Sequence, residues 1–364
     1  MRTWAEARIR FFDARLPEKV FERFFQRIRL QGKTMKPLIA LVQGDAAGIG
    51  PEVMGKLLSI DEVRSSARIL ILSDIRVFRA GNEVAALDTP VHVIDDIEGM
   101  DFEGDRPNLL HIPAIDPAQT PSGKVSIEAG AAVMRWFGEA LDLAAAGKVS
   151  GICFMPFNKQ AMHRAGLGAE DELQWAKQRL GSHSRASEFN VIDGMWNARV
   201  TSHIPLREVA DRLTTPEIME AVGLANGTLI RAGIERPRIA VAALNPHAGE
   251  GGTIGDEEIE IIEPAVAKAK AQRIDVSGPY PSDTLYPRLR DGAFDCVVSM
   301  YHDQGQIAIK LLGFDRGVTV LGGLPVPITT PAHGTAYDIA GKNRAAVEPA
   351  RRAFMTVCEM ARRA

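Results

Sequence analysis

Three histidines each follow a short apolar run that breaks into Pro, Gly or Asp residues. They are His203 in "NARVTSHIPL", His247 in "IAVAALNPHAGEGG" and His302 in "FDCVVSMYHDQG". Runs rich in Val, Ile, Ala and Met are typical of strands in a parallel sheet, and such sheets bind ligands beyond the carboxyl ends of their strands. Three imidazoles at such ends can converge on one divalent ion. The spacing predicts an enzyme with one metal site, for which zinc is preferred and magnesium, cobalt and nickel are alternatives.

Two further polar residues accompany these histidines. Asp303 follows His302 directly and could orient the imidazole, and Lys310 lies eight residues further along an otherwise apolar stretch. A lysine there could be a general acid or bind a carboxylate, although a solvated surface lysine is the alternative. Asp283 lies in a loop flanked by prolines, and "GDAAGIGPEV", residues 44–53, is either an anion-binding loop or a tight turn.

Composition limits the class of protein. The 364 residues are enough for one large or two ordinary domains, and 46% hydrophobic with 24% charged residues are globular values. A net charge of −3 gives no reason to expect nucleic acid as a partner. The three cysteines are far apart, which fits a reducing cytoplasm, and no apolar run reaches the length of a membrane span. We expect a cytoplasmic protein without a membrane span.

The first 36 residues differ from the rest because they are rich in Arg and Phe. They predict one or two amphipathic helices with a basic face, which could dock on a partner or on a membrane surface. The simpler interpretation, which we prefer, is a poorly constrained extension, with Met35 opening the domain proper.

From Lys36 onward, strand-like and helix-like segments alternate. Strands are expected within 37–43, 67–74, 90–95 and 149–157, and helices within 126–147, 206–233, 257–272 and 345–363, with Thr215 as the N-cap of a restarted helix before Pro216. This alternation predicts an α/β protein with a largely parallel sheet.

The segment "PAHGTAYDIAGKNRA", residues 331–345, resembles the loop that holds adenosine in the isopropylmalate and isocitrate dehydrogenases. On this resemblance His333 contacts the adenine, and Asp338 accepts the ribose hydroxyls and repels a 2′-phosphate, which favours NAD over NADP. The alternative is a glycine-rich turn ahead of the last helix. The candidate cofactor-binding residues are His333, Gly334, Thr335, Ala336, Asp338 and Asn343.

Taken together, the segments from about residue 37 to the C-terminus resemble the 4-hydroxythreonine-4-phosphate dehydrogenase family of pyridoxal phosphate biosynthesis. The matching motifs are "GDAAGIGPEV", "TSHIPLREVADRLT", "LNPHAGEGGTIGDEEIEIIEPAV", "GPYPSDTLY", "MYHDQGQIAIKLLGF" and "HGTAYDIAG". The resemblance implies an isocitrate/isopropylmalate dehydrogenase-like fold of two α/β/α domains with a cleft between them. It also implies a homodimer whose active site lies at the interface, with metal ligands His203, His247 and His302 drawn from both chains, and with Asp283 and Lys310 at the substrate.

We expect residues 37–150 with 319–364 to carry the cofactor loop, and residues 151–318 to carry the metal, the substrate and the dimer contact. The chain departs from the family where the substrate is bound. Glu172 and Leu173 replace the His and Thr of the family's "GHTE" segment, Thr319 replaces an Asn, and Ile328 replaces an Arg. Loss of an Arg fork suited to phosphate and gain of an acid put a phosphorylated substrate in doubt. The candidate substrate contacts are Glu172, Asp283, Lys310, Thr319 and Ile328.

The expected function is metal-dependent NAD oxidation of a secondary alcohol in a hydroxy acid, with decarboxylation where a carboxylate lies β to the new ketone. Lys310, ahead of Asp303, is expected to transfer the proton, and Asp283 is the third catalytic candidate. Alternative substrates are 4-phospho-threonate and an unphosphorylated acid such as a carboxylated cis-dihydrodiol. The alternative outside catalysis is a metal-binding scaffold without redox activity.

Overall fold

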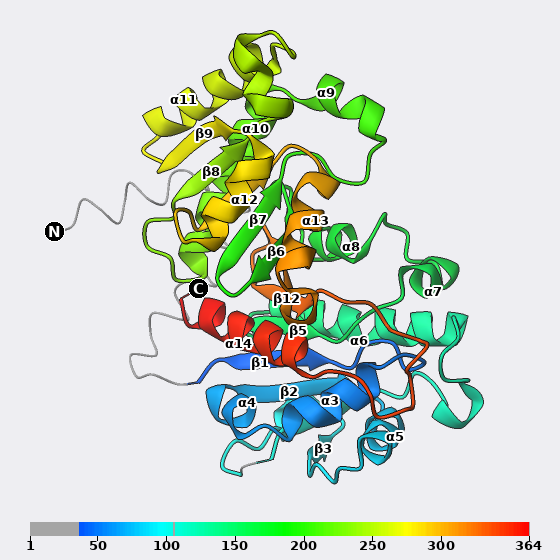
Figure 1. Ribbon diagram of the computed structural model, residues 1–364. Coiled ribbons are helices and arrows are strands. Elements are labelled where there is room, and N and C mark those ends of the chain that lie inside the picture. Colours follow the sequence, from blue (N-terminus) through cyan, green and yellow to red (C-terminus); the bar gives the residue numbers. More distant parts are fainter. Residues whose placement is uncertain (1–35, 105, 364) are drawn as a thin grey trace, which may run out of the picture.

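One twelve-stranded sheet is the frame of the molecule, in the order β3-β4-β2-β1-β5-β12-β11-β6-β7-β10-β8-β9 (Figure 1). The structure is a computed structural model that describes residues 36–104 and 106–363, so the helices predicted for residues 1–36 lie outside the described residues. The strands are β1 Leu38–Val42, β2 Arg68–Ser73, β3 His92–Ile94, β4 Asn108–His111, β5 Gly151–Phe154, β6 Ser187–Ile192, β7 Met195–Arg199, β8 Ile239–Ala242, β9 Val276–Tyr280, β10 Cys296–Ser299, β11 Val318–Gly322 and β12 Ile328–Pro331.

The sheet contains two parallel groups separated by a reversal. In the order across the sheet, the first group consists of β3, β4, β2, β1, β5 and β12, which are parallel to one another. The second group consists of β7, β10, β8 and β9, which are also parallel to one another. Between the groups, β11 pairs antiparallel with β12 and β6, and β6 pairs antiparallel with β7. The β6–β7 hairpin turns at Asp193 and Gly194, whose φ angles of 49° and 82° suit a two-residue hairpin loop. The predicted α/β class with a largely parallel sheet is confirmed.

Helices cover both faces of the sheet. Alternate residues of β1 point to opposite faces, so Ile39 and Leu41 join one apolar core and Leu38 and Val42 join the other. Helices α3, α10 and α14 contribute to the first core, and α6 contributes to the second. The helices are α3 Gly50–Leu58, α4 Asp61–Ser66, α5 Ile75–Ala85, α6 Ile127–Ala145, α7 Lys159–Arg164, α8 Glu172–Arg179, α9 Val209–Arg212, α10 Thr215–Arg231, α11 Glu263–Ala271, α12 Ser282–Arg290, α13 His302–Gly313 and α14 Glu348–Arg362.

One detail differs from the sequence-based expectation. The N-cap of α10 is Thr214 rather than Thr215, because the Thr214 hydroxyl accepts the N–H of Glu217 while the Thr215 hydroxyl donates to the carbonyl of Ile261. Strand β5 pairs with β1 and β12, so it belongs to the parallel group that contains β1. Among the described residues, the helices are too short or too polar to span a bilayer.

Candidate functional site

The three predicted metal ligands follow three neighbouring strands. Strand β10 pairs in parallel with β7 on one side and β8 on the other, so His203, His302 and His247 all lie beyond one edge of the sheet. Backbone pairing of β7 with β10 continues past the strands, since the N–H groups of Val200 and Thr201 donate to Ser299 and Met300. This brings the His203 and His302 rings to a centroid distance of 5.6 Å. We call this region the histidine edge.

The His302 imidazole is held by its neighbour. His302 opens α13, and its Nδ1 lies 2.6 Å from an Asp303 carboxylate oxygen. A contact of this kind fixes ring orientation and leaves Nε2 for a ligand, as is usual around metal-binding histidines. Asp303 therefore orients the His302 ring, and its exposed carboxylate already has the imidazole as a partner.

His247 lies on a loop of unusual backbone. Residues 247–252 all have positive φ, including the non-glycine residues His247, Ala248 and Glu250. Such conformations cost energy and persist only where the surroundings impose them. Buried Glu258 holds the residues just before this loop, because its carboxylate accepts the N–H groups of Leu244 and Asn245 at 2.8 Å each. The sequence did not single out Glu258, although a carboxylate this close to a glycine-rich loop could have drawn attention.

The loop leaves His247 exposed, with 69% of its side chain accessible, and its Nδ1 is 3.4 Å from Glu250. Within residues 36–104 and 106–363, no group of three or more His, Cys, Asp or Glu side chains is arranged to hold a metal ion. A single chain thus brings two of the three histidines together and points the third outward. Asp283 lies at the same edge, exposed at the start of α12 after β9, where it accepts the N–H of Thr284.

Helix α13 connects the histidine edge to a small cavity. The cavity has a volume of about 100 Å³ and is lined by Lys310, Glu188, Asn190, Thr319 and Ala332 among others. Lys310 is exposed, and no ion pair holds it among the described residues. Eight residues of α-helix rise about 12 Å, so His302 and Lys310 lie about that far apart along α13.

Glu188, which lines this cavity, belongs to a cluster of four charged side chains. The Glu188 carboxylate forms an ion pair with the Arg199 guanidinium at 2.8 Å and lies 4.0 Å from the Lys159 ammonium. The Lys159 ammonium in turn lies 3.5 Å from the Glu172 carboxylate. Burial raises the pKa of Glu172, although Lys159 opposes the shift, and burial lowers the pKa of Arg199. The sequence selected Glu172 but missed the other three. Polar residues at alternating positions of the strands "SEFNVI" and "MWNAR" were the available signal for Glu188 and Arg199.

Ile328 does not fit its predicted role as a substrate contact. Its side chain is fully buried in the apolar core on β12, where it pairs with Leu321 and Ile152. A side chain without accessible surface packs the sheet and contacts no small molecule. Leu173, which replaces the family's Thr, is likewise a core residue.

The predicted cofactor loop follows β12 and packs on the glycine loop that follows β1. The Ile49 N–H donates to the Thr335 carbonyl at 3.0 Å, and a side chain at Gly48 would collide with Thr335. The Tyr337 hydroxyl donates to the buried Asp45 carboxylate at 2.6 Å. Neither Asp45 nor Tyr337 was predicted from the sequence. We call this joint feature the cofactor edge.

The remaining candidates for cofactor binding lie on the same loop. His333 is partly buried, which lowers its pKa and favours the neutral imidazole, while Asp338 and Asn343 are exposed. Ala336 and Asn343 have positive φ, and Gly334 has open space around it. The loop therefore presents an exposed acid and backbone groups beside a neutral imidazole.

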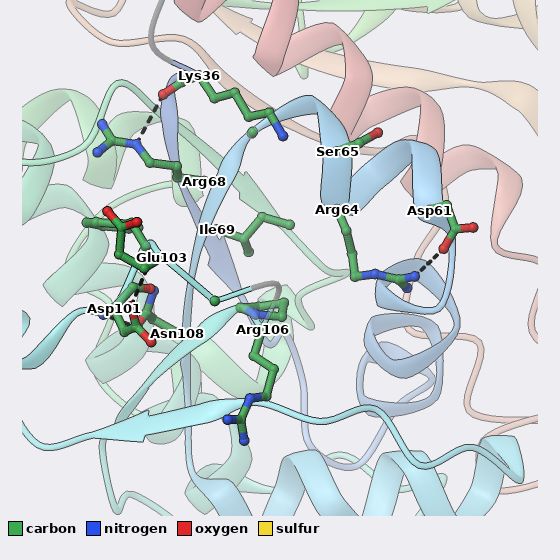
Figure 2. Close-up of a pocket in the computed structure, with 14 residues that line it drawn as sticks. Lys36, Asp61, Arg64, Ser65, Arg68, Ile69, Asp101, Glu103, Arg106 and Asn108 are labelled. Carbon is green, nitrogen blue, oxygen red and sulfur yellow. Dashed lines mark hydrogen bonds and ion pairs between the residues drawn. The ribbon is translucent and has the colours of Figure 1, made fainter.

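A cavity of about 380 Å³ at the amino ends of β2 and β4 contains none of the predicted site residues (Figure 2). Two of its arginines have structural partners. Arg68 donates to the Lys36 carbonyl and stacks on Phe102, and Arg64 pairs with Asp61. This cavity is separate from both edges.

Comparisons with known proteins agree with this geometry. Residues 65–357 match the family described as "Pyridoxal phosphate biosynthetic protein PdxA". A Pseudomonas aeruginosa protein named "Putative 4-hydroxythreonine-4-phosphate dehydrogenase 2" is 47% identical over 330 residues, which cover 90% of this chain and 97% of that protein. The D-threonate 4-phosphate dehydrogenase of Salmonella typhimurium is 37% identical over 316 residues, which cover 85% and 94%.

Among solved structures, 4-hydroxythreonine-4-phosphate dehydrogenase from Klebsiella pneumoniae superposes with a TM-score of 0.78 at 36% identity. The match covers 91% of this chain and all of that one. The predicted dehydrogenase-like α/β fold is confirmed.

Proposed function

Because this chain belongs to the pyridoxal phosphate biosynthetic protein PdxA family, we propose that it oxidises a secondary alcohol of a small hydroxy acid with NAD and a divalent metal. The chain is a dehydrogenase acting on CH–OH, of the 4-hydroxythreonine-4-phosphate and D-threonate 4-phosphate dehydrogenase type. The observation that carries the proposal is the placement of three histidines beyond three neighbouring parallel strands.

The donor set fits a divalent ion such as zinc. His203 and His302 offer two neighbouring imidazoles, and the Asp303 contact at Nδ1 leaves Nε2 of His302 available. His247 is exposed and, among the described residues, does not form a three-ligand group with them. We propose that His247 of one subunit completes the site of a second subunit in a homodimer, which accounts for a two-histidine group within each chain.

The cofactor edge fits an adenosine group. His333 and Thr335 would lie against the nucleotide, and exposed Asp338 would accept the ribose hydroxyls, which supports NAD over NADP. Gly334, Ala336 and Asn343 belong to the same proposed set. We further propose that the parallel group containing β1, β5 and β12 is the cofactor domain and that the group containing β7, β10 and β8 is the metal domain.

When bound, the metal would favour loss of the alcohol proton, and NAD would accept the hydride. Lys310 lies on the helix that His302 opens and lines the cavity beside it, so we propose its Nζ as the group that holds and moves the proton, with Asp303 as the alternative. Asp303 also orients His302, and Asp283 would hold a substrate hydroxyl at the same edge. For a substrate with a carboxylate β to the new ketone, the same Lys310 Nζ would return a proton after CO₂ leaves.

The test is NADH absorbance with zinc, magnesium, cobalt or nickel, across 4-hydroxythreonine 4-phosphate, 4-phospho-D-threonate, D-threonate and a dihydrodiol carboxylate. Metal-dependent NADH formation with one of them is expected. Saturable NAD binding without turnover of any acid would favour a binding protein and contradict the proposal.

A further inference from the structure

A single glutamine joins the loops of the histidine edge. We infer that Gln304 is a positioning residue that holds three of these loops at a fixed spacing, an inference that rests on the proposed function. The three loops carry His302, His247 and Asp283. Gln304 lies in the first turn of α13, and its side chain is half-buried. It acts on the site through the backbone of its neighbours.

The Gln304 amide contacts three separate segments of the chain. Its Oε1 accepts the backbone N–H of Met300 at 2.7 Å. Its Nε2 donates to the Ala243 carbonyl at 2.7 Å and to the Ser282 hydroxyl at 2.8 Å. These partners fix the orientation of the amide, because a backbone N–H needs an acceptor and a carbonyl needs a donor. Both N–H groups of Nε2 are therefore used on segments outside α13.

Two of these contacts cross from α13 to the loops that carry proposed functional residues. Ala243 follows β8 and lies four residues before His247, and Ser282 lies directly before Asp283. Buried Glu258 accepts the N–H groups of the two residues that follow Ala243, at 2.8 Å each. The chain that leads into the His247 loop is thus held both by Gln304 and by Glu258.

The third contact extends to the remaining histidine. Met300 lies two residues before His302, and its carbonyl accepts the hydroxyl of Thr201 at 2.8 Å and the N–H of Thr201 at 3.1 Å. Thr201 in turn lies two residues before His203. Through its bond to the Met300 N–H, Gln304 is therefore connected to the segments of both neighbouring imidazoles.

The groups that Gln304 serves are expensive to leave without a partner. Met300 and Ala243 are fully buried, and a buried N–H or carbonyl that loses its hydrogen bond destabilises the arrangement that exposed it. The Ser282 hydroxyl lies 3.4 Å from the Ala243 carbonyl, so Gln304 is the closer donor. A glutamate at position 304 could still accept the Met300 N–H, but an ionised carboxylate could not donate to the other two segments.

This difference allows a specific test. In the proposed dimer each subunit gives a pair of imidazoles to one site and His247 to the other, so a change in loop spacing should disturb every metal site. Full-length Gln304→Glu should show an altered visible spectrum of bound cobalt, because that spectrum depends on coordination geometry. Its Kd for zinc should rise about tenfold, the lower end of the cost of losing a partner outside the ligand set.

Two controls separate positioning from a general loss of structure. The affinity of Gln304→Glu for NADH should equal that of wild type, since the contacts described for the cofactor edge do not involve Gln304. Gln178→Glu makes the same substitution at an exposed position on α8 and should leave the cobalt spectrum and the zinc Kd unchanged.

Folded Gln304→Glu protein with the wild-type cobalt spectrum and zinc Kd would overturn the inference. An equal loss of zinc and NADH affinity, or the same zinc effect in Gln178→Glu, would also overturn it. If Gln304→Glu does not fold, Ser282→Ala decides, because it removes one acceptor of Nε2 at a half-buried position. Its zinc Kd should rise about threefold, as expected for one neutral hydrogen bond, and an unchanged Kd would overturn the inference. Wild-type protein that binds neither cobalt nor zinc would instead contradict the proposed function.

Discussion

The cofactor edge and the histidine edge are built in different ways. At the cofactor edge, two loops far apart in sequence are joined within one chain by the Tyr337–Asp45 and Ile49–Thr335 hydrogen bonds. At the histidine edge, His203 and His302 are neighbours, while His247 is exposed on a loop of positive φ angles. The contacts of the first edge are closed within one chain, whereas at the second edge one of the three proposed ligands is exposed. On the proposed function, cofactor binding would need one chain and metal binding would need two.

The largest expected effect comes from removing His302. His302→Ala should abolish both stoichiometric metal binding and NADH formation, because it breaks the pair of neighbouring imidazoles formed by His203 and His302. Elemental analysis measures the bound metal. Thermal unfolding should be little changed, since His302 is partly exposed and lies at a helix start. His92→Ala, on strand β3 at the opposite end of the strand order, is the control. Metal retained at the wild-type ratio would contradict the assignment.

A mixing experiment sharpens this prediction. His247→Ala and His302→Ala are each expected to be inactive, but if subunits share ligands, a mixed dimer contains one intact site. Co-refolded equal mixtures should then recover about a quarter of wild-type activity, because half of the dimers are mixed and half of their sites are intact. No recovery would place all three ligands in one chain and remove the contrast between the edges.

A smaller effect is expected at the cofactor edge. Tyr337→Phe removes the hydroxyl that donates to Asp45, and a hydrogen bond to a buried acceptor is worth about 1 kcal/mol or slightly more, so the Kd for NADH should rise about five- to tenfold. Fluorescence titration measures this, and hydrogen exchange of residues 332–341 without cofactor should accelerate. Tyr280→Phe on β9 is the control. Unchanged exchange in Tyr337→Phe would show that the loop does not depend on this bond.

Both edges illustrate what a sequence can disclose. The histidines were found because each follows an apolar strand, and the local pattern is enough to predict a strand end. Pairing of β7 with β10 and of β10 with β8 is not local, so the sequence alone could not show which two imidazoles would meet. Asp45 and Tyr337 are separated by 292 positions, and only the packing of two loops reveals their contact.

The same limit explains the errors. Ile328 was read by its position in a motif, whereas its burial depends on the neighbours that β12 acquires in the sheet. Thr215 precedes Pro216 and looked like an N-cap, but the N–H groups of the first turn are reached from Thr214. The positions of strands and helices follow from local periodicity, whereas the residues that each side chain contacts follow from the topology of the sheet.

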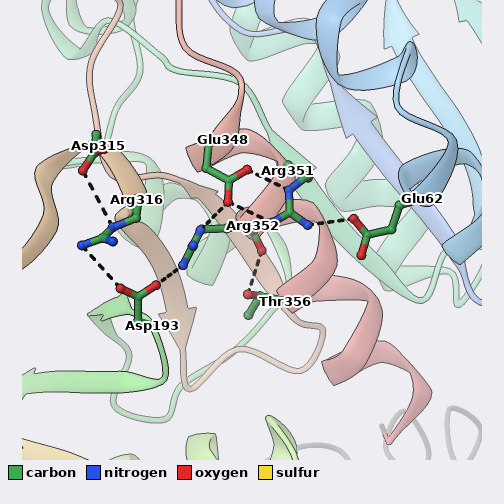
Figure 3. A network of polar contacts seen from close by, with 8 residues as sticks. All are labelled: Glu62, Asp193, Asp315, Arg316, Glu348, Arg351, Arg352 and Thr356. Atoms are coloured by element: carbon green, nitrogen blue, oxygen red, sulfur yellow. Dashed lines mark hydrogen bonds and ion pairs between the residues drawn. The ribbon is translucent and has the colours of Figure 1, made fainter. Parts of the chain in front are cut away.

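An ion-pair network joins the two parallel groups (Figure 3). The carboxylate of Glu348, at the start of α14, forms ion pairs with the guanidinium groups of Arg351 at 2.8 Å and of Arg352 at 2.6 Å. Arg352 also pairs with Asp193 in the β6–β7 turn, and Arg351 pairs with Glu62 on α4. Its partners lower the pKa of Glu348 to about 2, mainly through the Arg351 hydrogen bond. The network connects α14 with α4 and with the β6–β7 turn.

The smallest predicted effect follows from that pKa. An unfolded glutamate titrates near about 4.3, so the folded-state pKa is depressed and the stabilisation is complete above that value. It should fall as the pH drops from about 4 toward 2, where Glu348 becomes protonated in the folded protein as well. Because 37% of the Glu348 side chain is exposed, solvent screening limits the contribution to about 1 kcal/mol or less. The measurement is the difference in urea midpoint between wild type and Glu348→Gln. It should be constant from pH 7 to 5 and shrink below pH 4, whereas a difference independent of pH would mean that packing, not charge, connects the two groups at this point.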